Sequence, residues 1–262
     1  MKKFNSCVAG FLLALTTLAV SAVPVGKTPP VPEVFRPTVK VGFAPDMQLD
    51  SAMDSPLWQK MPSYRFMRYV TDINYINLSA TEGAEVRYLY NKETFFVRVD
   101  MIDSDVMTSA TENQNHHYIM GDVVEVFVKP ANDTYYWEVY GTPNKLYTRF
   151  YFPAGGSLGL PSCFGPTDVK IGVDARVDGT FNNQNDRDRS WSVIIAIPRR
   201  ELEKNGCKFE KGSAWTILAS RYNYSRFLPI HELSSFPQIF GGYHATKYYA
   251  NIEFINLETE NK

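Results

Sequence analysis

Two acidic residues stand in a stretch that is otherwise typical of a buried β-strand, and their chemistry is the first question that the sequence raises. Residues 121–130 read GDVVEVFVKP, which places Asp122 and Glu125 among valines and a phenylalanine. A carboxylate in such a strand is unfavourable unless a cation, an arginine or a hydrogen-bonding ligand meets it. We therefore expect a ligand-binding site at this strand and at the loop before it.

A pair of carboxyl groups is also what glycoside hydrolysis requires, at a separation of about 5 Å or of about 6.5–9.5 Å. Successive side chains of a strand point to opposite faces, so Asp122 and Glu125 cannot easily share one substrate. Glu125 falls on the same face as Val123 and Phe127. The other face is expected to carry Val124, Val126 and Val128. The alternation argues against a glycoside hydrolase and for a non-catalytic site.

Arg221 interrupts an apolar strand pattern, AWTILASRY, at residues 214–222. An arginine in such a place needs a carboxylate partner, and we expect Glu125 or Asp122 to supply it. Two roles stay open for Arg221 at this point. It could hydrogen-bond the hydroxyl groups of a ligand, or it could form a structural buried ion pair.

Two oxygen-rich loops are of the kind that can hold Ca²⁺. One contains Asp103 and Asp105, and the other is the run 182–188, NNQNDRD. Neither contains a complete EF-hand loop, and solvated loops would have the same composition. His116 and His117 are adjacent in sequence and suit a metal poorly without further ligands. A structural Ca²⁺ at Asp103 and Asp105 is thus a weak expectation.

The first 22 residues have the pattern of a secretory signal peptide. Two lysines precede an apolar run, and Val20-Ser21-Ala22 offers a small-residue cleavage site. We expect a signal peptide at residues 1–22, a proline-rich extended segment at 23–40 and one domain at 41–262. The mature chain would be soluble and either secreted or periplasmic.

The net charge of −1 lacks the basic excess of a nucleic-acid-binding protein, so we expect no nucleic-acid partner. No later segment is long and apolar enough to cross a membrane. After cleavage Cys163 and Cys207 remain. They could form one disulfide in an oxidising compartment, or they could be two small buried thiols.

Many short strand patterns separated by proline, glycine, asparagine or aspartate follow along the chain. One convincing helix is expected at residues 198–205, PRRELEKN, with Gly206 as its stop signal. Trp58, Trp191 and Trp215 are expected in the core. This pattern predicts an all-β, two-sheet antiparallel β-sandwich, jelly-roll-like, with one short helix. The expected strands are 85–90, 94–99, 122–129, 135–140, 146–152, 169–177, 191–197, 214–222 and 248–255.

Five stretches in series give the chain a resemblance to the family 9 carbohydrate-binding modules, within the DOMON-like superfamily. They begin with LDSAMDSPLW at 49–58 and VRYLYNKETFFVRVDMIDSDV at 86–106. GDVVEVFVKP with YYWEVYGTPNKLY follows, and then DGTFNNQNDRDRSWSVIIAIPRREL. The last are SAWTILASRYNYS and FGGYHATKYYANIEF. No single stretch is specific for the family, but the five stretches in this order are. Together they span nearly the whole expected mature chain.

The resemblance implies a β-sandwich that binds sugar without catalysis, accessory to a glycoside hydrolase that degrades xylan or another polysaccharide. Family members hold a terminal sugar between two facing aromatic rings, which correspond here to Tyr118 and Tyr243. Asp122, Glu125, Arg221, Tyr222 and His244 are the polar and aromatic groups expected around it. The characterised clamp of the family uses tryptophan at both ring positions, so this chain departs from it and offers less stacking area. Structural calcium is frequent in the family.

Related sandwich domains of the same superfamily bind haem b, which gives an alternative function in electron transfer. Met101, Met107 or Met120 could serve as an axial ligand, although nothing separates them from core methionines. The sequence contains no CxxCH motif, which excludes covalently attached c-type haem.

Overall fold

The computed structural model describes residues 36–71, 78–154 and 169–257, and strands dominate these ranges. The expected signal peptide and Cys163 lie outside the described residues. β1 begins at Thr38, inside the segment 23–40 that was expected to be extended. Within the described ranges, none of the helices combines the length and the apolar character that crossing a bilayer requires.

Nine of the strands match expected ones to within a few residues, and four short ones were not expected. The strands are β1 (Thr38–Phe43), β2 (Tyr64–Arg65), β3 (Met67–Arg68), β4 (Ala84–Tyr90), β5 (Thr94–Ile102), β6 (Val123–Pro130), β7 (Tyr136–Gly141), β8 (Tyr147–Phe152), β9 (Gly172–Asp178), β10 (Ser190–Pro198), β11 (Trp215–Asn223), β12 (Glu232–Phe236) and β13 (Ala250–Asn256). The α-helices are α1 (Leu49–Ala52) and α3 (Arg199–Leu202). Within the described residues the 3₁₀ turns are η1 (Pro56–Lys60), η3 (His117–Ile119) and η4 (Thr246–Tyr248).

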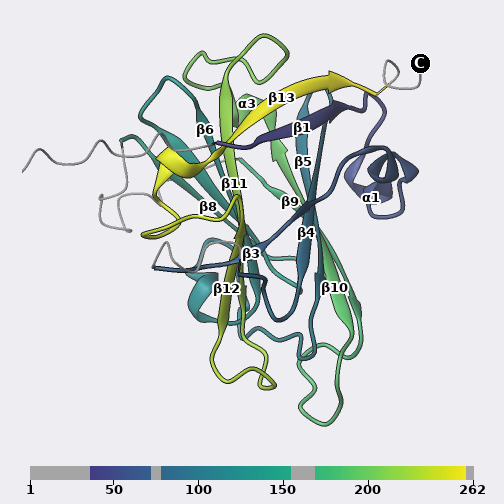
Figure 1. Cartoon of the computed structure of the whole chain (residues 1–262). Helices are drawn as coiled ribbons and strands as arrows, with labels where there is room; N and C mark the ends of the chain where they lie inside the picture. The colour runs from purple at the N-terminus through teal and green to yellow at the C-terminus, as the bar shows by residue number, and fades with distance from the viewer. Residues whose placement is uncertain (1–35, 72–77, 155–168, 258–262) are drawn as a thin grey trace, which may run out of the picture. The chain divides into compact units, whose positions relative to one another are not determined.

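The strands form one continuous hydrogen-bonded sheet, in the order β8-β7-β6-β11-β13-β1-β4-β5-β10-β9, with β2, β3 and β12 attached beside it. Most pairs are antiparallel, but β1 runs parallel to both β13 and β4. Figure 1 shows β13 and β1 side by side across the upper part of the molecule, with β4 and β10 below them and β8 and β11 further to the left. The all-β prediction is confirmed, whereas the prediction of two separate antiparallel sheets with one helix is not. The parallel strand β1 joins the two halves, and the described residues include two short α-helices.

The main core lies between the two halves of the sheet. Val124, Val126 and Val128 of β6 belong to the same buried cluster as Val193 and Ile195 of β10. A Cβ atom on Gly141 would lie 2.7 Å from Ile195, so β7 and β10 approach too closely for a side chain there. The sheet therefore folds back on itself around one apolar interior.

The four tryptophans are buried, as expected for Trp58, Trp191 and Trp215. The indole N–H groups of these three donate to the Ala52 carbonyl oxygen, to the Asp103 carboxylate and to the Lys208 carbonyl oxygen. Because each buried N–H has an acceptor, these residues are structural.

Candidate functional site

A second aromatic cluster covers the other face of β6, β7, β8 and β11, and we call it the tyrosine face. Its buried aromatic side chains are Phe127, Tyr136, Tyr140, Phe150, Phe152, Tyr243 and Tyr249. Tyr69, Tyr118, Tyr222 and Tyr248 pack against them while remaining partly exposed. Side chains of β6 alternate between the two faces of the sheet. Val123 and Phe127 belong to the tyrosine face, and the main core contains Val124, Val126 and Val128.

Two glutamates are buried in the tyrosine face, Glu125 on β6 and Glu138 on β7, with exposures of 2% and 3%. Glu125 accepts a hydrogen bond from the Ser220 hydroxyl at 3.1 Å. The Tyr140 hydroxyl donates to Glu138 Oε1 at 2.5 Å, while Glu138 Oε2 is buried without a hydrogen bond. Burial raises the pKa of Glu138 to about 8, and burial with the nearby Glu138 raises that of Glu125 well above its usual range.

The other buried acids of the described residues are satisfied differently. Glu201 contacts Arg149 and Lys204, and Asp188 accepts backbone N–H groups of Val106 and Thr180. Among residues 36–71, 78–154 and 169–257, no lysine or arginine forms a salt bridge with Glu125 or Glu138, and no backbone N–H group donates to them. Buried carboxyl groups with raised pKa values and incomplete hydrogen bonding are frequent at functional sites.

Three tyrosine rings run from the edge of this face into its interior. Tyr118 in η3 lies 5.7 Å from Tyr222 of β11, and Tyr222 lies 5.8 Å from Tyr243, measured between ring centroids. Tyr118 and Tyr222 are partly exposed, but Tyr243 is only 7% exposed. The Tyr243 hydroxyl donates to the Ser234 carbonyl oxygen at 3.2 Å. Tyr118 and Tyr243, which the family resemblance gives as two facing rings, are thus in one cluster, with Tyr222 between them.

His244 stands at the rim of the tyrosine face, with its side chain 40% exposed. Its Nδ1 lies 2.8 Å from the Tyr136 hydroxyl, and its Nε2 lies 3.9 Å from Glu138 Oε2. Burial lowers the pKa of His244. The imidazole is therefore an exposed group next to Glu138 Oε2, a buried carboxyl oxygen with no hydrogen-bond partner in the part of the chain that the structure describes.

Arg221 does not pair with Glu125 or Asp122, which corrects the sequence-based assignment. Its guanidinium contacts Asp103 at 2.7 Å, and both side chains are fully buried. It also donates to the carbonyl oxygens of Glu82 and Ile102. In the β6–β11 register Arg221 is opposite Val124, whereas Ser220 is opposite Glu125, so Arg221 and Glu125 point to opposite faces.

Asp122 is fully buried and holds the loop before β6 in place. Its carboxylate accepts the backbone N–H groups of Met107 at 2.7 Å and Tyr224 at 2.8 Å. Burial raises its pKa well above the usual range. With Glu125 on the tyrosine face and Asp122 bonded to these loops, the two do not form a paired site.

Asp103 and Asp105 are engaged within the protein. Asp103 accepts hydrogen bonds from Arg221 and from the Trp191 indole, and Asp105 accepts the Arg226 backbone N–H at 2.8 Å. Within 36–71, 78–154 and 169–257, no group of three or more His, Cys, Asp or Glu side chains is arranged to hold a metal ion. Met101, one of the methionines considered for haem, is buried in the main core.

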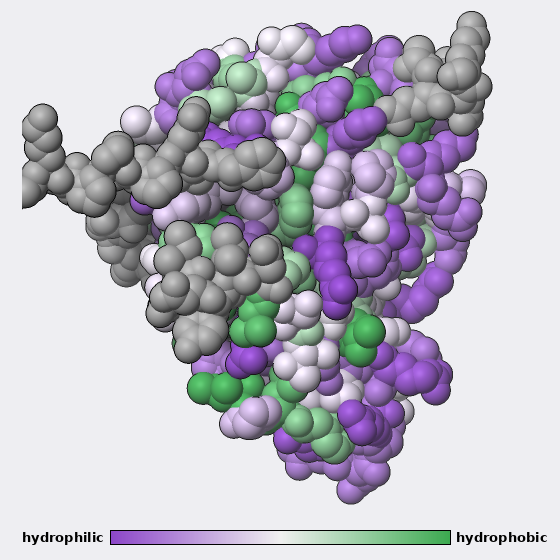
Figure 2. Space-filling view, in the orientation of Figure 1, coloured by the Kyte–Doolittle hydropathy of each residue, from purple (hydrophilic) through white to green (hydrophobic). Residues whose placement is uncertain are grey.

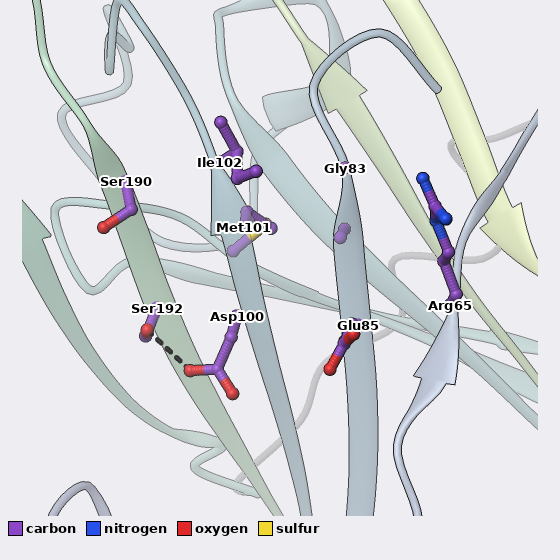
Figure 3. Close-up of a pocket in the computed structure, with 9 residues that line it drawn as sticks. Arg65, Gly83, Glu85, Asp100, Met101, Ile102, Ser190 and Ser192 are labelled. Carbon is purple, nitrogen blue, oxygen red and sulfur yellow. Dashed lines mark hydrogen bonds between the residues drawn. The ribbon is translucent and has the colours of Figure 1, made fainter. Parts of the chain in front are cut away.

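A groove of about 390 Å³ lies elsewhere, along the ends of β4, β5 and β10. Figure 3 shows Asp100 of β5 beside Ser192 of β10, with Glu85 on β4 and Arg65 on β2. The Ser192 hydroxyl donates to Asp100 at 2.7 Å, and Arg98 contacts the same carboxylate. The charge of Asp100 is thus already balanced by an arginine, unlike the two glutamates of the tyrosine face.

Figure 2 shows hydrophobic residues in small separate groups among hydrophilic ones on the side of the molecule in view.

Sequence reasoning missed Glu138 and Tyr140, the residues that complete the buried acid pair. The stretch YYWEVY was recognised as a strand, and Glu138 interrupts it just as Glu125 interrupts β6. Alternation would have placed Tyr136, Glu138 and Tyr140 on one face. The interrupted strand pattern could have pointed to Glu138. That Glu138 lies on the same face of the sheet as Glu125 follows only from the β6–β7 register.

Comparison with solved structures gives three similar folds. A candidate carbohydrate-binding protein from Bacteroides uniformis ATCC 8492 is 12% identical, with a TM-score of 0.67 over 84% of this chain and all of that one. A family 9 carbohydrate-binding module from Caldicellulosiruptor kristjanssonii in complex with cellotriose is 10% identical, with a TM-score of 0.53 over 84% of this chain and 94% of the module. The same kind of module in complex with glucose is 9% identical, with a TM-score of 0.53 over 84% of this chain and 96% of the module.

No protein-family model matches the sequence, and no curated protein matches it either. At 9–12% identity the structural likeness concerns the fold. The chain therefore has a domain with the fold of the family 9 carbohydrate-binding modules.

Proposed function

We propose that this protein is an exported, non-catalytic carbohydrate-binding protein that binds an oligo- or polysaccharide at the tyrosine face. The observation that carries the proposal is Glu138 Oε2, a buried carboxyl oxygen that lies among tyrosine rings and has no hydrogen-bond partner among the described residues. A sugar hydroxyl can donate to such a group or accept from it, and the C–H faces of a sugar ring pack on aromatic rings.

Tyr118, Tyr222 and His244 are the partly exposed groups through which a sugar would approach. A sugar ring would lie against Tyr118 and Tyr222, and displacement of the His244 ring would bring a hydroxyl to Glu138. The fold supports this proposal, because structures with the same fold were solved with cellotriose and glucose. Xylan- or glucan-derived chains are the expected ligands, and a glycoside hydrolase acting on the same polysaccharide is the expected partner.

Replacing Tyr222 or Tyr118 by alanine is expected to weaken oligosaccharide binding by about 1–3 kcal/mol, by analogy with bases stacked on aromatic side chains. Isothermal titration calorimetry against a glycan panel measures this loss. Tyr147→Ala is the matched control, because Tyr147 packs against the main core instead of the tyrosine face. Tyr243 is less suitable, since its buried ring and hydrogen bonds make its loss a stability change.

Two results would count against the proposal. One is the absence of binding to every glycan of the panel. The other is binding that both alanine variants leave unchanged. A Soret band in the absorption spectrum of the purified protein would instead point to the haem alternative.

A further inference from the structure

The tyrosine face holds two acidic side chains on neighbouring strands, because the β6–β7 register places Glu125 opposite Tyr140 and Glu138 opposite Phe127. Burial, and then the nearby Glu138, raise the pKa of Glu125. Among the described residues, no lysine or arginine side chain bonds to either of them. The Ser220 hydroxyl donates to Glu125 and the Tyr140 hydroxyl to Glu138, and His244 Nε2 lies 3.9 Å from Glu138 Oε2.

The aromatic rings around the two glutamates also favour a cation at this site. The face of an aromatic ring carries partial negative charge, which attracts cations by about 0.5–2 kcal/mol. Tyr118, Tyr222 and Tyr243 form a continuous series of such rings on the same face as the two glutamates. An ammonium group offers three N–H donors and a positive charge, and it meets both needs at once. A uronic acid would instead bring a third carboxyl group next to the two glutamates, which is unfavourable.

We infer that the tyrosine face selects a sugar with a free, protonated amine, of the glucosamine type, over neutral and acidic sugars. The ammonium group would lie between Glu138 and Glu125, and the sugar ring would rest on Tyr222. Glu138 would release its proton to solvent as the ammonium group binds, and Oε2 would then accept a hydrogen bond from the ammonium group. This inference rests on the proposed function, because it names the ligand class of the same site.

The test is calorimetry at pH 7 with four ligands of matched length. They are a β-1,4-linked glucosamine trimer, its N-acetylated form, cellotriose and a glucuronic-acid-containing oligosaccharide. The wild-type protein is expected to bind the free-amine trimer about tenfold more tightly than cellotriose, since charge-assisted hydrogen bonds are roughly twice as strong as neutral ones. Glu138→Gln keeps the shape but cannot ionise when the ammonium group binds, so the variant's preference for the amine should fall below about threefold.

Glu253→Gln is the matched control, because Glu253 is exposed on β13 and should leave the preference unchanged. Glu125→Gln is a second variant of the site in case Glu138→Gln does not fold. Equal affinity of the wild-type protein for the amine trimer and cellotriose would overturn the inference and leave the proposed function in place. An amine preference that survives in both site variants would also overturn it. Failure of all four ligands to bind would contradict the proposed function as well.

Discussion

Replacing Arg221 by methionine is expected to lower the free energy of unfolding by about 3–5 kcal/mol, because it leaves a buried carboxylate without its partner. Arg221 and Asp103 are both fully buried and 2.7 Å apart. The change also removes the donors to the carbonyl oxygens of Glu82 and Ile102. Urea denaturation at pH 7 measures the loss, which should be visible as a large shift of the midpoint.

The chain offers a control of the same chemistry at the surface. Arg176 contacts Asp54 at 2.7 Å, but their side chains are 60% and 74% exposed. Arg176→Met should cost no more than about 1 kcal/mol, as surface ion pairs do. The double variant Arg221→Met/Asp103→Leu should recover part of the stability, because it removes the unpaired charge. A loss below 1 kcal/mol for Arg221→Met alone would contradict the buried ion pair.

Stability is expected to fall as the pH rises from about 5 to 8, and Glu138→Gln should reduce this fall markedly. The pKa of Glu138 is about 8 in the folded protein against 4.5 for an ordinary glutamate, because burial disfavours its charged form. Below pH 4.5 both the folded and the unfolded states are protonated. Above pH 4.5 Glu138 ionises in the unfolded state but not in the folded state. Unfolding therefore becomes easier until the pH passes the pKa of Glu138 in the folded protein.

A difference between 4.5 and about 8 corresponds to at most about 5 kcal/mol, at 1.36 kcal/mol per pKa unit. Glu125 contributes in the same direction. Chemical denaturation at pH 5, 6, 7 and 8 compares the wild-type protein with Glu138→Gln and with the exposed-site control Glu253→Gln. A wild-type stability that is flat over this window would show that Glu138 is not held neutral. An equal slope in Glu138→Gln would assign the pH dependence to other groups.

Alternation along single strands could be predicted reliably from the sequence. Val124, Val126 and Val128 were expected on one face of β6 and Val123, Glu125 and Phe127 on the other, and the buried clusters and the Glu125 contacts confirm this. Period-two alternation depends on the backbone of one strand alone. The same reasoning correctly separated Asp122 from Glu125.

Relations between strands could not be predicted in the same way. The partner of Arg221 was assigned wrongly because the β6–β11 register places Arg221 opposite Val124, and a shift of one residue reverses every side chain. The parallel pairing of β1 with β13 joins residues more than 200 positions apart, and nothing local in either segment specifies it. Glu138 was missed for the same reason, since only the β6–β7 register brings it to Glu125.

The most direct test of sugar binding at the tyrosine face is a crystal structure of the protein with cellotriose at a saturating concentration. The expected result is a sugar ring against Tyr118 and Tyr222, with one hydroxyl oxygen about 2.5–3.0 Å from Glu138 Oε2. A sugar bound instead in the groove beside Asp100 and Ser192, with the tyrosine face unchanged from its unbound arrangement, would contradict the assignment.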